Sequence, residues 1–267
     1  MLMAIEVFNR REIKYMISDQ QKEELLSIIG NYMESDPYNR DGKTYSICNL
    51  YLDTESDELI RKSLEKPEFK EKIRLRSYGT VPLDATVFLE SKKKFDSVVN
   101  KRRTPFILSD AYRYFEDGTL PEDWGGTLQS GGAVQPAGTV SAEPQPAPSK
   151  PKMNVQVMRE IDYIMHFYNL KPRVYISYDR LAFFEKNNSD FRLTIDRNIQ
   201  TRRTDLRLDS PAYGDQLLPE GKWLMEAKAF KAFPLWFVHF LSEHKIYSTS
   251  FSKYGAEYKN YLKKGRN

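Results

Sequence analysis

Charged and apolar side chains alternate at every second position in several segments of the sequence. In the segment KIRLRSY, Lys72, Arg74 and Arg76 alternate with Ile73 and Leu75. Successive side chains of a β-strand point to opposite faces, so the three bases are expected on one face of one strand. Arginine presents a fork of donors that matches phosphate oxygens, and lysine presents a compact positive charge. The pattern therefore predicts a strand face suited to phosphate groups.

The same period recurs in other segments, where single carboxylates stand among the bases. The sets that share a face are Arg10, Glu12 and Lys14; Glu90, Lys92 and Lys94; Arg192, Thr194 and Asp196; and Glu226 with Lys228. Half-buried strands also alternate when their polar face is simply solvated, and this is the plainer interpretation of any one segment. If the sheet closes into a barrel, however, the bases converge in its lumen and require a partner of negative charge.

The carboxylates do not fit a site for anions alone. A few carboxylates among many bases suggest a divalent cation that is held jointly by carboxylate and phosphate oxygens. Bases, a metal ion and phosphates together are the groups that catalyse phosphoryl transfer, where positioning and charge stabilisation dominate. The sequence therefore indicates chemistry on phosphate chains.

The elements that must position these residues are mostly strands. Periodicity predicts strands at 4–17, 46–52, 70–78, 86–94, 101–106, 173–180, 190–197 and 222–230. It predicts helices from Ser18, near Thr54, at 109–115, at 154–168, from Pro234 and at 255–263, and Gln21 completes a capping box with Ser18. Strands with appended helices indicate an α+β class with a mainly antiparallel sheet.

The chain is expected to form a single domain over residues 1–267, interrupted by one segment of low complexity. Residues 118–153 are rich in proline and glycine, and 125–149 contain no lysine or arginine. Such a composition cannot bury enough apolar surface to offset its ordering entropy, so we expect a flexible insertion between two halves.

Composition and missing motifs exclude several classes of protein. The single cysteine, Cys48, rules out a disulfide framework and a cysteine-based zinc cluster. No HExxH, GxSxG, Walker or GxGxxG motif is present. The net charge of +4 argues against a general coat for DNA. With no signal peptide and no long apolar run, we expect a cytoplasmic protein.

Seven short motifs, in order, resemble the polyphosphate polymerase (vacuolar transporter chaperone, VTC) domain of the triphosphate tunnel metalloenzyme superfamily. They are REIKY at 11–15, IRLRSYG at 73–79, FLESK at 88–92, YDRLAF at 178–183, FRLTID at 191–196, LMEAK at 224–228 and FSKY at 251–254. Together they cover nearly the whole chain outside the proline-rich segment. The resemblance implies an eight-stranded antiparallel β-barrel, a tunnel with flanking helices whose basic lining holds a polyphosphate chain.

The activity that the resemblance implies is transfer of the γ-phosphate of ATP to growing inorganic polyphosphate, with Mn²⁺ or Mg²⁺ bound to the triphosphate. The substrate-binding residues would be Lys14, Arg74, Arg76, Lys92, Lys101, Tyr178, Arg180, Arg192, Lys228 and Lys253. Arg102 and Arg103 are adjacent alternatives to Lys101.

Four of the residues matched by the resemblance would also be catalytic, namely Ser252, Lys253, Arg74 and Arg76. Glu226 would be the metal carboxylate, with Glu12 and Glu90 as further ligands. An ion pair with Lys228 is the alternative role for Glu226.

Two other functions fit the same residues. A tripolyphosphatase or nucleoside triphosphatase would use the same site with water as acceptor, and a non-catalytic module would bind polyphosphate or RNA on the basic face alone. Export of a polymer would need a separate membrane subunit. The sequence leaves open the oligomeric state and the length of the product.

Overall fold

The computed structural model describes residues 11–39, 42–96, 98–121, 152–186, 190–230 and 232–265. Most of the expected proline-rich insertion, residues 122–151, lies outside the described residues, as does Arg10. The strands are β1 (Arg11–Ser18), β2 (Met33–Ser35), β3 (Tyr45–Asp53), β4 (Phe69–Tyr78), β5 (Thr86–Phe95), β6 (Val98–Ile107), β7 (Lys171–Glu185), β8 (Arg192–Arg202), β9 (Asp215–Gln216), β10 (Lys222–Ala229) and β11 (Ser248–Thr249).

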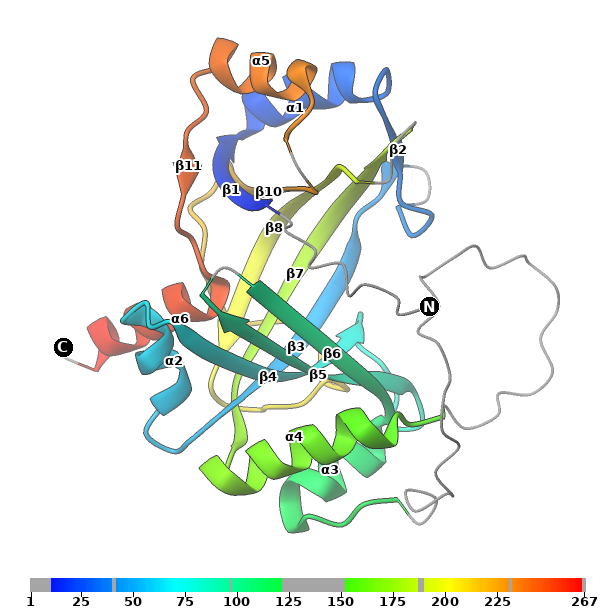
Figure 1. Cartoon of the computed structure of the whole chain (residues 1–267), viewed down its shortest axis with the longest axis vertical. Coiled ribbons are helices and arrows are strands. Elements are labelled where there is room, and N and C mark those ends of the chain that lie inside the picture. Colours follow the sequence, from blue (N-terminus) through cyan, green and yellow to red (C-terminus); the bar gives the residue numbers. More distant parts are fainter. Residues whose placement is uncertain are drawn as a thin grey trace, which may run out of the picture.

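These strands form one antiparallel sheet in the order β11-β1-β10-β8-β7-β3-β4-β5-β6, while β2 pairs with β7 and β9 with β8 (Figure 1). The predicted α+β class with an antiparallel sheet is confirmed. The prediction of eight strands in a closed barrel was wrong: the sheet has 11 strands and its two end strands are not hydrogen-bonded to each other in the described part of the chain. The additional strands β2, β9 and β11 have only two or three residues, too few to produce a readable period.

The helices are α1 (Asp19–Ile29), α2 (Glu58–Leu64), α3 (Leu108–Asp117), α4 (Val155–Tyr168), α5 (Leu235–Glu243) and α6 (Lys253–Lys264). The predicted capping box at the start of α1 is confirmed, because the Ser18 hydroxyl accepts from the Gln21 backbone and the Gln21 side chain accepts from the Ser18 backbone. No helix within the described ranges combines the length and the hydropathy needed to cross a membrane.

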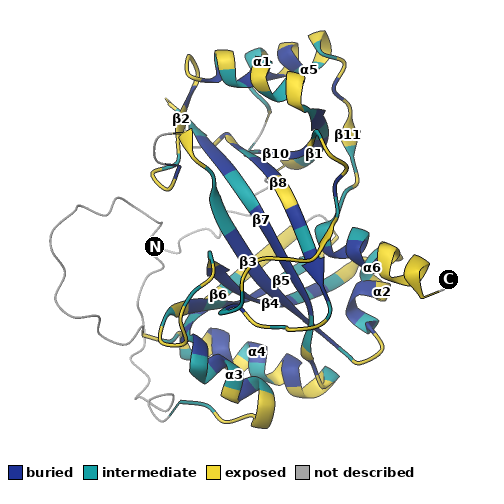
Figure 2. Cartoon of the chain, turned by 180° about the vertical axis from the view of Figure 1, so that it is seen from behind, coloured by how far each residue is buried: buried dark blue, intermediate teal, exposed yellow. Residues whose placement is uncertain are grey.

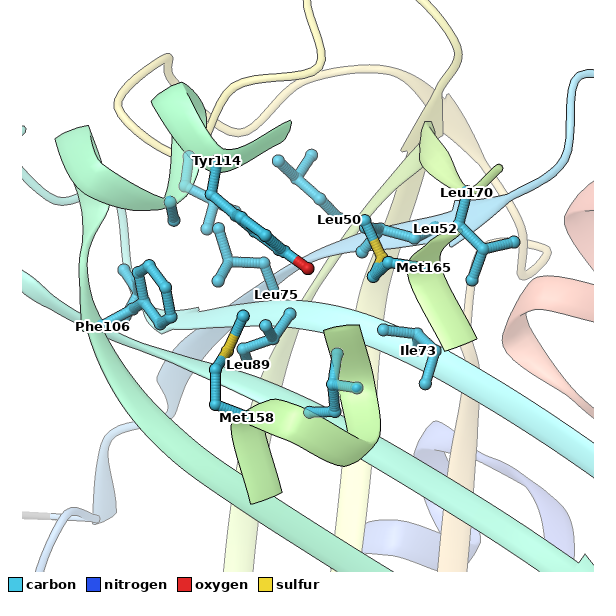
Figure 3. Packing of buried hydrophobic residues seen from close by; sticks show 14 of the residues in the cluster. Leu50, Leu52, Ile73, Leu75, Leu89, Phe106, Tyr114, Met158, Met165 and Leu170 are labelled. Carbon is cyan, nitrogen blue, oxygen red and sulfur yellow. The ribbon is translucent and has the colours of Figure 1, made fainter. Parts of the chain in front are cut away.

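The apolar side of the charged strands is covered by helices rather than by water. Ile73 and Leu75 of β4 are completely buried beneath α3 and α4, in a cluster that includes Met158 and Tyr114 (Figure 3). A second cluster packs α1 and α5 against the other end of the sheet, so that the strands in Figure 2 are largely buried while the helices expose one side. We call the side covered by α1, α3, α4 and α5 the outer face and the side that carries Lys72, Arg74 and Arg76 the inner face.

A third cluster lies on the inner face itself, where α2 and α6 cover part of it. Tyr254 of α6 lies against Tyr51 of β3, with 4.9 Å between the ring centres. Tyr258 follows one turn later in the same cluster. Because α6 packs on the inner face, the residues at its first turn are placed next to the charged side chains.

Asp53, at the end of β3, fastens α2 and α6 to the sheet. This fully buried carboxylate accepts hydrogen bonds from the backbone of Thr54, Leu59 and Ile60 and from the Tyr254 hydroxyl, at 2.8–3.0 Å. Burial raises the pKa of Asp53. These four bonds join two helices and one strand at a single side chain.

Replacing Asp53 with alanine is expected to lower the free energy of unfolding by about 3 kcal/mol, because buried donors lose a charged acceptor. Urea denaturation followed by circular dichroism measures this change. The matched control is Asp215→Ala, which removes an exposed ion pair with Lys264 and should cost about 1 kcal/mol or less. Equal effects of the two substitutions would contradict the role given to Asp53.

Candidate functional site

The pairing register places the predicted basic residues side by side on the inner face. Lys14 lies opposite Glu226 in the β1–β10 pair and Arg74 opposite Glu90 in the β4–β5 pair. Arg180 lies opposite Asp196 in the β7–β8 pair. These side chains are not a solvated strand surface, since Arg76 is 7% exposed and Glu90 is 1% exposed. The plainer interpretation of the alternating charges is therefore wrong for these strands.

Side chains connect the two ends of the open sheet. The Lys92 ammonium of β5 lies 3.8 Å from a Glu12 carboxylate oxygen of β1, although these strands are far apart in the sheet order. Lys72 Nζ donates to Ser252 Oγ at 3.4 Å, and Lys14 Nζ donates to the Phe251 carbonyl at 3.1 Å. The sheet therefore curls until residues 251–252 bridge its ends, and we refer to its curled inner face as the tunnel wall.

Glu90 holds the bases of β4 in place. Arg74 donates to Glu90 through Nε at 2.8 Å, and Lys101 lies 3.2 Å from the other Glu90 oxygen. Burial alone would raise the pKa of Glu90, but the charges of Arg74, Arg76 and Lys101 outweigh it and lower that pKa to about 2. Arg74 also donates to the Tyr51 hydroxyl at 3.1 Å. The charged side chains are thus fixed before any ligand binds.

A second charged group lies across the tunnel, around Asp196. Arg180 donates to both oxygens of this buried carboxylate at 2.7 and 2.8 Å, and Lys253 donates to one of them at 2.6 Å. The Lys253 ammonium also lies 4.2 Å from the centre of the Tyr178 ring. Despite burial, the charges of Arg180 and Lys253 lower the pKa of Asp196, so the carboxylate stays ionised between its two cations.

The start of α6 delivers Ser252 and Lys253 to this group. Ser252 is the N-cap residue and its hydroxyl accepts from the Gly255 backbone at 3.3 Å, so the helix begins two residues earlier than the sequence pattern predicted. Figure 1 shows α6 beside α2 at one end of the sheet. Its first turn, which faces the inner wall, carries both of the predicted catalytic residues outside β4.

The predicted metal carboxylates do not form one cluster. Glu226 and Glu12 lie together, because Lys228 Nζ is 2.5 Å from Glu226 and 3.7 Å from Glu12 and Lys14 contacts both carboxylates. Glu90 instead pairs with the β4 arginines. In the described ranges no three acidic, histidine or cysteine side chains converge on one point suitable for a metal.

A pair of carboxylates nevertheless fits the chemistry of Mg²⁺ or Mn²⁺, which usually keep water and phosphate oxygens as their other ligands. Burial alone would raise the pKa of Glu226, but the positive charges of Lys228, Lys14 and Arg180 outweigh it and hold that pKa far below the usual range. Glu226 is therefore available as a charged oxygen ligand beside Glu12, and the ion pair of Glu226 with Lys228 exists as well.

The structure also separates the three adjacent bases of β6. Lys101 and Arg103 lie opposite Lys92 and Glu90 and so share the inner face, whereas Arg102 lies opposite Ser91 and contacts Glu160 of α4 at 3.2 Å on the outer face.

Arg192 lies opposite Lys228 at the start of β8. Its guanidinium is exposed and lies 5.0 Å from the centre of the Phe184 ring, at the edge of the group.

Four inner-face residues received no site role from the resemblance: Lys72, Asp196, Asn49 and Tyr51. Lys72 and Asp196 share the period of Arg76 and Arg192, so the pattern contained them. Asn49 accepts from Arg76 Nε at 3.0 Å. Nothing in the sequence marks Asn49 or Tyr51, since β3 is largely apolar on both faces and is buried almost throughout.

The affinity of the tunnel for anions is expected to fall between pH 7 and pH 9. Burial lowers the pKa of Lys72 and that of Lys101 to about 8, so both lose their charge in this range. Tyr51, whose pKa Arg74 and Lys72 lower to about 7 despite burial, gains a negative charge in the same range. All three changes disfavour a bound anion.

Calorimetric titration with tripolyphosphate at pH 7, 8 and 9 measures this dependence. Lys72→Arg keeps its positive charge at all three pH values. Above pH 8 its affinity for tripolyphosphate should therefore fall less steeply than that of the wild type, by up to about tenfold per pH unit. An unchanged slope in Lys72→Arg and in Tyr51→Phe would show that neither group titrates on binding.

The fold and the site together define a class: an antiparallel sheet with helices on its outer face and paired cations on its curled inner face. The sequence model of the VTC domain matches residues 9–262, and the chain belongs to the VTC domain family. Among curated proteins, none matches the chain.

Solved structures with a similar arrangement have low sequence identity. A candidate adenylate cyclase from Bacillus halodurans is 13% identical with a TM-score of 0.47, and covers 91% of this chain and 95% of its own. The PH1819 protein from Pyrococcus horikoshii OT3 is 11% identical with a TM-score of 0.42, over 94% and 99% of the two chains.

Proposed function

We propose that this protein is a metal-dependent polyphosphate polymerase, which transfers the γ-phosphate of ATP to a growing inorganic polyphosphate chain. The observation that carries the proposal is a set of lysines that face each other across neighbouring strands. Lys70 lies opposite Lys94, Lys72 opposite Lys92, and Lys92 opposite Lys101. Like charges directly opposite one another destabilise a sheet. Glu12 contacts Lys92 and Glu90 contacts Lys101, and a bound polyanion would offset the repulsion that remains.

The extent of these pairs favours a long chain over a lone triphosphate. The Arg74–Glu90 and Arg180–Asp196 groups would hold phosphates inside the tunnel. The Lys70–Lys94 pair continues the same row along β4 and β5, one step beyond Lys72, toward the turn between β5 and β6. A phosphohydrolase that binds only a triphosphate has no need of this extension. The polymerase is therefore preferred to the phosphohydrolase, which would use the same groups with water as acceptor.

The described side chains suit the charge requirements of phosphoryl transfer. Arg74, Arg76 and Arg180 would orient the phosphate chain, since each guanidinium is fixed by Glu90, Asn49 or Asp196. Lys253 and Ser252 at the start of α6 would contact the transferred group and stabilise the charge on its oxygens. A divalent ion held by Glu226 and Glu12 together with the phosphates would neutralise further charge on the triphosphate.

The test is incubation of the purified protein with ATP and Mn²⁺, followed by gel staining for polyphosphate and separate assays for ADP and free phosphate. Polymer with an equivalent amount of ADP is the expected result. Free phosphate without polymer would establish the phosphohydrolase instead. Tight binding of polyphosphate or RNA without turnover would indicate a binding module.

We place the reaction in the cytoplasm, where ATP is available, and assign any export of the polymer to a separate membrane subunit.

A further inference from the structure

Four aromatic side chains gather at one end of the inner face. Tyr38, Tyr45, Tyr78 and Phe88 form this group, which we call the tyrosine platform. The rings of Tyr38 and Tyr78 are parallel within 9°, with centres 6.3 Å apart, and Tyr45 lies 6.0 Å from Tyr38 and 6.4 Å from Tyr78. Phe88 stands edge-on to Tyr78 at 6.1 Å. Tyr38 is 74% exposed and Tyr78 is 47% exposed, so ring surface is open to a ligand.

The tyrosine platform is continuous with the phosphate-binding residues. Tyr45 lies directly opposite Arg180, and Phe88 directly opposite Arg76. Tyr78 follows Arg76 by two residues on β4, and therefore shares its face. Lys72 contacts Ser252 at the other end of the same strand, six residues away, which is about 20 Å of extended chain. Along β4, Arg74 and Arg76 thus lie between the tyrosine platform and the contact of Lys72 with Ser252.

Hydrogen bonds fix the turn that carries Tyr38, the most exposed ring of the platform. The next residue, Asn39, is 3% exposed and donates to the Arg180 carbonyl at 3.0 Å, while its side-chain oxygen accepts from the Ala182 backbone at 2.8 Å. Asp36 also joins its backbone to Ala182 at 2.9 Å, and its side chain accepts from the Tyr38 backbone. The turn that presents Tyr38 is thereby attached to the strand that carries Arg180.

We propose that the tyrosine platform binds the nucleobase of the nucleoside triphosphate donor, with the phosphates lying among Arg76, Arg74 and the group that Arg180 and Lys253 form around Asp196. This rests on the proposed function, because it names where the donor of that reaction is held. Rigid aromatic rings beside arginines are the usual surface for stacking a base, and stacking discriminates little between bases. We therefore expect ATP and GTP to bind with similar affinity.

The experiment compares a nucleotide with an inorganic ligand of the same phosphate length. Tyr38→Ala, Tyr78→Ala and the double variant are titrated calorimetrically with ATP and with tripolyphosphate in one Mg²⁺ buffer. The double variant should lose roughly tenfold in affinity for ATP and none for tripolyphosphate. Tyr38→Trp and Tyr78→Phe keep a ring and should retain the affinity for ATP. Tyr163→Ala, an exposed tyrosine of α4 in a separate aromatic pair with Phe167, is the control.

Each other outcome has a distinct meaning. Unchanged ATP affinity in the double variant would overturn the nucleobase site. Equal loss for ATP and tripolyphosphate would also overturn it, because the tyrosines would then act only through the fold of the tunnel. Wild-type protein that binds tripolyphosphate but no nucleotide would do the same. If the expected differences appear but no polymer is made, the nucleobase site stands and the polymerase assignment fails.

Discussion

Replacing Lys253 with alanine is expected to lower the rate of polyphosphate synthesis by about 10²–10³-fold at saturating ATP, the usual cost of removing one group that stabilises charge in a transition state. The fold should survive, because Arg180 still donates to both oxygens of Asp196 when the lysine is absent. Initial rates of ADP release and of polymer formation measure the loss, and thermal denaturation checks the fold.

The matched control for this substitution is Lys259→Ala, an exposed lysine in the same helix, which should leave the rate unchanged. Lys253→Arg is the stricter comparison, because it retains the charge but changes its reach. If Lys253→Ala makes polymer at the wild-type rate, the start of α6 does not contact the transferred phosphate. A loss in rate that is matched by an equal loss of folded protein would assign Lys253 a purely structural role.

Replacing Glu226 with glutamine is expected to raise the Mn²⁺ concentration required for half-maximal rate by at least roughly tenfold. Glutamine keeps the shape of the side chain but removes the charge that Lys228 and Lys14 now contact at 2.5 and 3.7 Å. Rates measured across a Mn²⁺ titration, at fixed ATP, give this concentration directly.

Glu90→Gln is the informative partner of this experiment, since Glu90 also lies on the inner face but pairs with Arg74 and Lys101. It should lower stability, because the buried Arg76 and the partly buried Arg74 lose their carboxylate, and leave the Mn²⁺ requirement unchanged. The same Mn²⁺ requirement in the wild type and in Glu226→Gln would exclude Glu226 as a ligand. A shift in Glu90→Gln alone would move the metal to the β4–β5 side of the tunnel.

Much of the tunnel wall could be predicted because its residues lie on long strands with a strict period of two. Arg74, Glu90 and Arg180 share a face with their neighbours whatever the rest of the fold does. The choice among Lys101, Arg102 and Arg103 could not be made in this way, since it depends on how β6 is aligned against β5. One residue more or less in the connecting turn would exchange the two faces.

Other features depend on contacts that no local pattern reports. Tyr51 lies in a strand that is buried on both sides, and it becomes part of the tunnel only because Arg74 reaches it from the next strand. Tyr38 lies in a turn, and its position is set by the contacts of Asn39 with a strand about 140 residues later in the chain. Sheet closure was over-predicted because side chains, rather than backbone hydrogen bonds, join the ends.

The opposed lysines of β4, β5 and β6 also bear on how the chain folds in a cell. Their mutual repulsion is present in the folded protein and is relieved in the unfolded chain, where the same lysines are far apart. Any polyanion that enters the tunnel therefore shifts the folding equilibrium by mass action, in proportion to its concentration relative to its dissociation constant. Under the proposed function, the abundance of the folded protein is in this way tied to the supply of phosphate chains, and the proposed substrate is also a folding ligand.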